Sequence, residues 1–455
     1  MSPKENSSNI HTLTEEVKRQ VDRFTTNDDV AHPFDLKELL LKIRDLDEDT
    51  YFSTLKYIPA EMLAEVIAEL PSHLQLEASE GMGVKKLAKI TTEMETDDAA
   101  DFLQNIDKTE DVLNKINLDD QKVIRELISY NADVAGAYMQ TELFSVGEDE
   151  VVADAIARLR QMKKSGEIQG IGQVYITKVI DKFICSIGIE ELVFLDITKT
   201  FKVSLESGEI DKNIIAANHF DDIKDVVSKV SDYNLHAIPI IDDEDKLLGR
   251  ITSDDIYDLI QTHATEEMFG MAGLNAEVEA AEDIHQAAKQ RALWLGINLF
   301  TAIAASMVVG FYEQTIQSFV ALAVLMPIVA SMGGNAGTQT LTVTVRRLSI
   351  GEIDLSNAFD TLKKEISLSL MNGLLFALVI GVLSYFWFKI PMLGVVIAVS
   401  TIINLFIAGF SGAIIPLVLD RLNIDPAIAS TVLLTTITDI IGFFSFLGLA
   451  KLMLI

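Results

Sequence analysis

Long apolar runs dominate the last third of the chain. Five runs without a basic residue hold between 21 and 31 residues each: 292–312, 315–345, 366–388, 390–419 and 426–450. A helix that crosses a bilayer needs about 20 apolar residues. The pattern therefore predicts a membrane domain of five transmembrane helices over residues 291–455, and five buried core helices in succession are the alternative.

Apolar residues recur with helical spacing between residues 36 and 135. Helix starts follow one another about every 12 residues, at Asp47, Ala60, Ser72, Asp97 and Asp119. Pairs of short helices at such an interval indicate a small α-solenoid. Most of the acids in this helical domain are expected to form a solvated face.

Residues 136–262 alternate between predicted strands and helices. Strands are predicted at 172–179 and 183–188, and the same order returns about 70 residues later with strands at 236–241 and 247–251. This doubled unit resembles a tandem pair of cystathionine-β-synthase (CBS) domains, which we expect at residues 136–200 and 201–262.

The second CBS copy ends in GRITSDD. Its Thr252 and Asp255 match the Thr-x-x-Asp pattern with which CBS domains bind an adenosine ribose. The first copy reads SIGIEEL and lacks both residues. The resemblance implies a candidate ATP site at Thr252 and Asp255, and a purely structural role of both domains is the alternative.

Two further segments complete the predicted organisation. Residues 1–35 are polar, and we expect a flexible segment there. Residues 263–290 have an amphipathic helical pattern and lead into the first membrane span. This connecting helix is long enough to transmit movement between the two halves of the chain, although an inert linker is the alternative.

Charge is distributed unequally along the 455 residues. The net charge is −30, and the first 291 residues contribute 30 Lys/Arg against 59 Asp/Glu. Nucleic-acid binding needs a basic footprint, so this composition argues against nucleic acid and favours cations as partners. The one cysteine, Cys185, excludes an internal disulfide and a paired-cysteine metal site.

Basic residues also indicate the orientation in the membrane. With the N-terminal half inside, seven Lys/Arg flank the inner ends of the spans, and Lys389 and Lys451 flank the outer ends. Inner loops carry the excess of Lys and Arg. We therefore expect the acidic half in the cytoplasm and the C-terminus outside.

Two features of the membrane half suggest ion chemistry. The run MGGNAGTQT, Met332–Thr340, should break a helix and expose carbonyls and the Asn335 amide, with close packing through small residues as the alternative. Asp439 lies near the middle of the last span, where an acid marks a functional site by default. A structural hydrogen bond from a neutral acid is the alternative for Asp439.

Four local motifs stand out: ATEEM (264–268), PIVASMGGNAGTQT (327–340), DPAIAS (425–430) and TTITDIIG (435–442). Together with the order of the domains, these motifs resemble the MgtE family of bacterial magnesium channels or transporters. The resemblance implies a homodimer in the bacterial inner membrane that imports Mg²⁺ and closes when cytoplasmic Mg²⁺ binds between its domains.

The resemblance also implies particular metal-binding residues. Asp439 matches the pore aspartate of the family, and Asn335 lies in its pore-adjacent turn. The regulatory metal positions that match are Asp97, Asp98, Asp255, Glu266 and Glu267. The chain departs from the family at Thr431-Val432, where many members have Gly-Pro.

Alternative functions stay open from the residues alone. A divalent-metal transporter preferring cobalt or manganese belongs to the same class. A membrane-bound metal or nucleotide sensor that conducts nothing belongs to another class. An enzyme is disfavoured, because no phosphate-cradling glycine loop, His/Cys cluster or nucleophile arrangement is found in the sequence.

Overall fold

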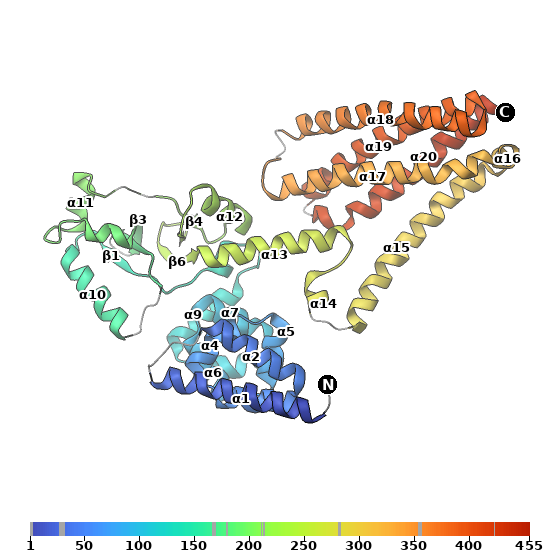
Figure 1. Cartoon of the computed structure of the whole chain (residues 1–455). Coiled ribbons are helices and arrows are strands. Elements are labelled where there is room, and N and C mark those ends of the chain that lie inside the picture. The colour runs from blue at the N-terminus through green and yellow to red at the C-terminus, as the bar shows by residue number, and fades with distance from the viewer. Residues whose placement is uncertain are drawn as a thin grey trace. The chain divides into compact units, whose positions relative to one another are not determined.

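The computed structural model divides into two compact units, residues 1–260 and 261–455. The structure describes residues 3–26, 32–165, 170–178, 181–210, 212, 214–280, 284–353, 357–422 and 424–455. Figure 1 shows helices throughout the chain and strands only in its middle part. Each unit is described by itself below.

Short helices form the first part of the first unit. They are α1 (Pro3–Thr26), α2 (Pro33–Leu46), α3 (Glu48–Tyr57), α4 (Ala60–Ala68), α5 (Ser72–Glu80), α6 (Val84–Glu93), α7 (Thr96–Asn105), α8 (Thr109–Leu113) and α9 (Leu118–Ser129). Pro59 and Pro71 directly precede α4 and α5, where a missing backbone N–H is tolerated. The predicted string of short amphipathic helices is confirmed.

The N-terminal segment differs from the flexible segment that we expected. Residues 3–26 form α1, and its Val17 and Val21 are buried. These residues lie four apart, so they share one face of the helix. Because α1 packs against α2 through this face, the expectation of flexibility is wrong for Pro3–Thr26.

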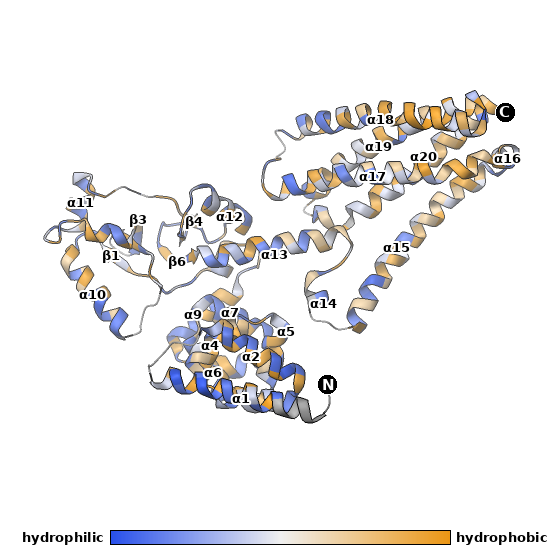
Figure 2. Ribbon diagram, viewed as in Figure 1, coloured by the Kyte–Doolittle hydropathy of each residue, from blue (hydrophilic) through white to orange (hydrophobic). Residues whose placement is uncertain are grey.

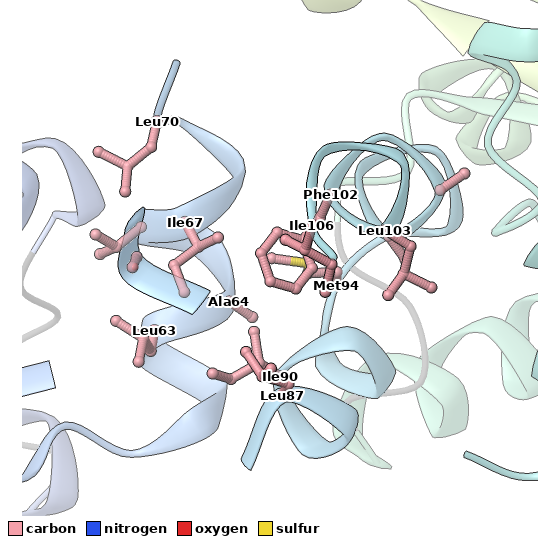
Figure 3. Packing of buried hydrophobic residues seen from close by; sticks show 14 of the residues in the cluster. Leu63, Ala64, Ile67, Leu70, Leu87, Ile90, Met94, Phe102, Leu103 and Ile106 are labelled. Atoms are coloured by element: carbon pink, nitrogen blue, oxygen red, sulfur yellow. The ribbon is translucent and has the colours of Figure 1, made fainter. Parts of the chain in front are cut away.

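One hydrophobic core joins these helices. Ile67 of α4 and Phe102 of α7 are fully buried, and Figure 3 shows Met94 and Ile106 beside the Phe102 ring. Burying a large apolar side chain contributes about 1.5–3 kcal/mol. The same core includes Ile238, Ile240 and Ile251 of the second CBS copy, so the helical domain and that copy fold as one packed body.

Two three-stranded sheets follow. The first contains β1 (Ser145–Gly147), β2 (Gln173–Lys178) and β3 (Lys182–Gly188), and the second contains β4 (Ala217–Asn218), β5 (Ala237–Ile241) and β6 (Leu247–Thr252). In each sheet the first pair of strands is parallel and the second antiparallel. The helices beside them are α10 (Val152–Ser165), α11 (Phe201–Ser207) and α12 (Ile223–Asp232).

The repeated sheet order confirms the tandem CBS architecture. Cys185 of β3 lies in the core of the first copy, fully buried, and burial raises the pKa of its thiol to about 11. Tyr175 and Phe183 of the first copy pack with Leu247 of the second copy. The two copies therefore share an apolar contact.

The second unit contains the five predicted spans. They are α15 (Ile284–Phe311), α17 (Ala321–Ser349), α18 (Ala358–Phe388), α19 (Pro391–Arg421) and α20 (Pro426–Leu454), each long and apolar enough to cross a membrane. Figure 2 shows apolar residues along most of their length. The short helix α16 (Glu313–Ser318) lies between α15 and α17.

The connecting segment is less continuous than the sequence predicts. Helix α13 runs from Ser253 to Met271, the short α14 covers Ala276–Ala280, and α15 begins at Ile284. Gly273 has φ +72°, a left-handed conformation suited to glycine, just after α13 ends. A helix break at this glycine replaces the single connecting helix expected over 263–290.

The glycine-rich run does not break its helix. Helix α17 continues from Ala321 to Ser349 through Gly333 and Gly337. A Cβ on Gly333 would clash with the Asn404 amide of α19, and one on Gly337 would lie 2.7 Å from Leu434 of α20. The prediction of an irregular backbone is wrong, and these glycines instead permit close helix packing, which was the alternative.

Candidate functional site

Acidic side chains gather where α7 begins. Glu95 precedes this helix, and Asp97 and Asp98 lie in its first turn. One carboxylate oxygen from each of the three lies within 4.8 Å of the other two. Acids are favoured in a first helical turn because the free backbone N–H groups there carry partial positive charge. We call Glu95, Asp97 and Asp98 the acidic cluster.

Asp97 is the most buried residue of the acidic cluster. Its side chain is 7% exposed, and its Oδ1 atom has no hydrogen-bond partner among the described residues. A buried acceptor without a partner costs about 1–3 kcal/mol. A proton, a water molecule or a cation is therefore needed beside this oxygen.

The first turn of α13 contributes a further acid, Asp255. Its Oδ2 atom accepts hydrogen bonds from Thr252 Oγ1 at 2.7 Å and from Gln140 Nε2 at 3.3 Å. After burial, the charge of Asp255 is the next largest cause that raises the pKa of Asp97. The starts of α7 and α13 thus lie within electrostatic reach of each other.

The segment Gln140–Glu142 ties the two helix starts together. Thr96 Oγ1 donates to Glu142 Oε2 at 3.0 Å, and Thr141 N donates to Thr96 Oγ1 at 2.9 Å. At the other end of the segment, Gln140 and Arg250 exchange two backbone hydrogen bonds of 2.8 and 2.9 Å. These contacts hold α7 next to β6, which leads directly into α13.

Burial and mutual repulsion raise the pKa values of these acids. Burial, followed by the charge of Glu95, raises the pKa of Asp98 to about 7. Burial and the charge of Asp255 raise the pKa of Asp101 to about 6. Because ionised carboxylates repel one another in this buried setting, a divalent cation would stabilise their ionised forms.

The donor atoms of the acidic cluster fit a hard cation. They are carboxylate oxygens throughout, which are the ligands that Mg²⁺ and Ca²⁺ prefer, whereas imidazole and thiolate suit softer metals. The partnerless Oδ1 of Asp97 offers a free position on this all-oxygen set. The cluster residues could therefore hold Mg²⁺.

Asp439 lies in the middle of α20 and is half-buried. No hydrogen bond or ion pair to its carboxylate occurs within the described part of the chain. The hydroxyl groups of Thr435 and Thr438 donate instead to the backbone of their own helix, at 3.0 and 3.1 Å. The carboxylate is therefore free to accept from a ligand.

Asn335 lies at about the same depth as Asp439. Gly333 of α17 and Gly442 of α20 both contact the Asn404 amide, and Gly337 contacts Leu434. The order of these contacts makes α17 and α20 antiparallel, which places residue 335 level with residues 438–439. Asn335 is exposed, and its Nδ2 donates to Ser331 Oγ at 3.3 Å. Asn335 and Asp439 therefore lie at the same height along their helices, and no hydrogen bond joins them among the described residues.

The second half of α13 belongs to the second unit and packs on its transmembrane helices. Glu267 pairs with Arg346 at the end of α17, at 3.8 Å, and Glu266 pairs with His263 at 3.3 Å. Thr431 Oγ1 donates to the carbonyl of Met271 at 2.8 Å. Of the two predicted metal acids of α13, Glu267 is thus engaged in an ion pair, and Glu266 lies against the His263 ring.

Sequence reasoning missed several residues of this region. Asp101 lies four positions after Asp97, on the same helical face, so helical spacing could have identified it. No sequence pattern distinguished Glu95 and Glu142 from the many other acids of this half. Arg250, which is 2% exposed, could not be distinguished from a surface arginine without knowing the pairing of β6.

Three family profiles match the chain. Residues 326–449 match the profile described as "Divalent cation transporter", residues 31–133 match the MgtE intracellular N domain, and residues 208–262 match the CBS domain. The profile matched to the CBS domain covers the second copy, which keeps the Thr-x-x-Asp pattern.

Curated relatives and a solved structure agree with the profiles. The magnesium transporter MgtE of Enterococcus faecalis is 30% identical over 72% of this chain and 71% of its own length. The magnesium transporter MgtE of Bacillus subtilis is 27% identical over 93% and 92%. The crystal structure of the soluble part of a magnesium transporter covers 57% of this chain and 99% of its own, with 25% identity and a TM-score of 0.50.

An intracellular helical domain, a CBS pair and five membrane-crossing helices together define a divalent cation transporter class. The match to the Enterococcus faecalis relative extends over more than two thirds of both chains. The chain belongs to the MgtE family of magnesium transporters.

Proposed function

We propose that the chain imports Mg²⁺ through a pathway on which Asp439 provides the fixed negative charge. The observation that carries this proposal is a half-buried carboxylate in the middle of a membrane span, with no partner among the described residues. An ionisable group is retained at such a depth only where it serves an ion path or a polar partner. Hydrated Mg²⁺ needs acceptors for its water hydrogens, and a carboxylate accepts strongly.

A homodimer in the bacterial inner membrane is part of this proposal. One protomer brings one mid-membrane acid, and two copies on a shared axis would double the fixed charge. The proposed orientation puts the first unit in the cytoplasm and the C-terminus outside, as the Lys/Arg excess on the inner flanks supports.

Cytoplasmic Mg²⁺ is proposed to close the pathway by binding at the acidic cluster and Asp255. The support comes from Asp97, whose buried Oδ1 lacks a partner, and from the raised pKa values of its neighbours. Metal binding there would replace repulsion between the starts of α7 and α13 by shared coordination. Because α13 continues to Met271, a change at its first turn can reach the second unit along one helix.

The regulatory acids of the second unit take a different part in this proposal. Glu267 is paired with Arg346 at 3.8 Å, and Glu266 lies 3.3 Å from the His263 ring. We propose that both glutamates help to bind regulatory Mg²⁺ or balance its charge on α13.

ATP binding at Thr252 and Asp255 stays a prediction. The Oδ2 atom of Asp255 accepts hydrogen bonds from Thr252 and Gln140, so ATP would have to replace these contacts to reach that oxygen.

A metal-uptake assay in liposomes tests the proposal. Purified full-length protein is reconstituted, and uptake of Mg²⁺, Co²⁺, Mn²⁺ and Ca²⁺ is compared. We expect Mg²⁺ to enter fastest and internal Mg²⁺ in the millimolar range to slow it. Faster uptake of Co²⁺ or Mn²⁺ would identify that ion, rather than Mg²⁺, as the preferred cargo. No uptake of any ion, with Mg²⁺ binding retained, would favour a sensor.

A further inference from the structure

Arg250 is a buried cation that interacts with the buried Tyr175 hydroxyl but forms no ion pair with a carboxylate among the described residues. It lies on β6 and is 2% exposed, and its Nε atom has no hydrogen-bond partner in that part of the chain. Burying a charge is costly unless opposite charge lies close by. The structure around Arg250 should therefore contain the negative charge that compensates it.

Backbone pairing directs Arg250 toward the region of the acidic cluster. Gln140 N donates to Arg250 O at 2.8 Å, and Arg250 N donates to Gln140 O at 2.9 Å. Residues that exchange both bonds are directly opposite, so their side chains lie on the same face. The Gln140 side chain reaches Oδ2 of Asp255 at 3.3 Å. The guanidinium therefore extends on the side where Asp255 lies.

Electrostatics agrees with this placement. Burial and the charge of Glu142 raise the pKa of Glu95, and the charge of Arg250 opposes them. Glu95 belongs to the acidic cluster, so the guanidinium acts on one of the three carboxyls proposed to hold metal. Arg250 and the Glu95 carboxylate are close enough to interact without forming a direct ion pair.

We propose that Arg250 is a built-in counter-cation that sets the Mg²⁺ concentration at which the acidic cluster binds metal. This inference rests on the proposed regulatory role of that cluster. Without metal, the guanidinium compensates part of the carboxylate charge and holds the cluster together. When Mg²⁺ arrives, the same positive charge repels it and weakens its binding.

The size of the effect follows from Coulomb repulsion. A divalent and a monovalent cation separated by several ångströms in a partly buried site repel each other strongly, although solvent and salt reduce the repulsion. Removing the charge of Arg250 should tighten Mg²⁺ binding by roughly three- to thirty-fold. A guanidinium with a purely structural role would leave the binding midpoint unchanged.

The test measures Mg²⁺-dependent protection of the full-length protein. Purified protein is digested with a protease, or melted, over a series of Mg²⁺ concentrations, and the midpoint of protection is recorded. Arg250→Met removes the charge and keeps most of the side-chain length, whereas Arg250→Lys keeps the charge. We expect the midpoint to fall three- to thirty-fold in R250M and to stay near that of the unmodified protein in R250K.

A charge-matched double variant guards against misfolding. Glu95→Gln combined with R250M removes one negative and one positive charge, so the net charge of the region is retained. Its midpoint should lie between those of R250M and E95Q alone. This comparison remains decisive if R250M by itself aggregates, because the double variant must then bind Mg²⁺ more tightly than E95Q.

Two results overturn the inference in different ways. Arg250 does not oppose the metal if folded R250M has a midpoint equal to or above that of the unmodified protein. The same conclusion follows if the double variant binds Mg²⁺ no more tightly than E95Q. If the unmodified protein itself shows no Mg²⁺-dependent protection, the proposed regulatory site is wrong and the inference falls with it.

Discussion

The acidic cluster of the first unit and Asp439 of the second unit place carboxylates in opposite settings. Asp97 has two neighbouring carboxyls within 4.8 Å and further acids around it. Asp439 has neither an acidic nor a basic partner among the described residues. Several carboxylates around one point can hold a cation firmly, whereas a single one attracts a hydrated cation and releases it again.

The neighbours of the two sites differ as well. Around the cluster, Thr96, Thr141 and Gln140 form hydrogen bonds that link α7 with the start of α13. Around Asp439, Thr435 and Thr438 bond to their own helix and link nothing. A metal site whose neighbouring hydrogen bonds link two helices is suited to regulation. A metal site whose neighbouring hydrogen bonds stay within one helix is suited to ion passage.

Replacing Asp439 should have the largest effect. Asp439→Asn keeps size and polarity but removes the charge that attracts divalent cations, so we expect Mg²⁺ uptake in liposomes to fall more than tenfold. Asp439→Glu should retain part of the uptake. Uptake by the Asn variant at the unmodified rate, with equal protein in the membrane, would make Asp439 a packing residue.

Replacing Asp97 and Asp98 by Asn should separate regulation from passage. Uptake at low internal Mg²⁺ should persist, while the internal Mg²⁺ needed to slow it should rise about tenfold or more, because two charged ligands are lost. Flux is measured against internal Mg²⁺ concentration. Asp119→Asn with Asp120→Asn is the matched control, since these acids also occupy a first helical turn and Asp119 is exposed. An unchanged closing concentration would contradict the regulatory assignment.

The stability of the metal-free protein should depend on pH. The folded-state pKa of Asp98, about 7, and of Asp101, about 6, lie above the ordinary value of 3.8. The stability that protonation provides is fully present below pH 3.8 and is lost as pH rises through these raised values. Between pH 6 and 8 the unfolding free energy falls by about 1 kcal/mol through Asp98 and by about 0.4 kcal/mol through Asp101, most of whose titration lies below pH 7. Thermal unfolding in EDTA should therefore show a higher Tm at pH 6 than at pH 8.

Added Mg²⁺ should reverse this pH trend. Metal binds the ionised carboxylates, so its stabilisation should be greater at pH 8 than at pH 6. The D97N/D98N variant provides the control, since it lacks two of the acids and should show a weaker pH dependence. A Tm in EDTA that rises from pH 6 to pH 8 would contradict the burial of these acids.

Glu266→Ala combined with Glu267→Ala should have the smallest effect. The Glu267–Arg346 pair is partly exposed, at 22% and 58% of the two side chains, and exposed pairs contribute about 0.2–1 kcal/mol. The closing Mg²⁺ concentration should rise by a factor of roughly two to five. Flux against internal Mg²⁺ is the measurement, and no change would assign both acids to a solvated surface.

Much of this architecture could be predicted from the sequence, because local patterns determine it. Long apolar runs identified the five spans, and the repeated pattern of the middle region identified β2, β3, β5 and β6, whereas the short strands β1 and β4 were not predicted. The glycine run of α17 was misjudged, since its stability depends on Asn404 and Leu434 from other helices. The connecting helix was misjudged at Gly273, whose left-handed backbone ends it.

The candidate sites divide in the same way. Asp97, Asp98 and Asp255 were found through the family resemblance, which carries spatial information that periodicity lacks, whereas Asp439 was also identified by its position in the middle of the last apolar run. Glu142 and Arg250 could not be found, because each reaches the cluster region through a tertiary contact. Thr96 meets Glu142 across 46 positions of the chain, and no local pattern encodes such a separation.

The buried Cys185 makes the protein a convenient host for spectroscopic probes. It is the one cysteine of the sequence, and its fully buried thiol has a pKa of about 11. Thiol reagents attack the exposed thiolate, so the native side chain should remain unlabelled under mild conditions. A cysteine introduced at the exposed Lys122, with a second in the membrane half, would accept spin labels selectively. Distances between such labels, measured as Mg²⁺ is added, would follow the regulatory movement directly in the intact protein.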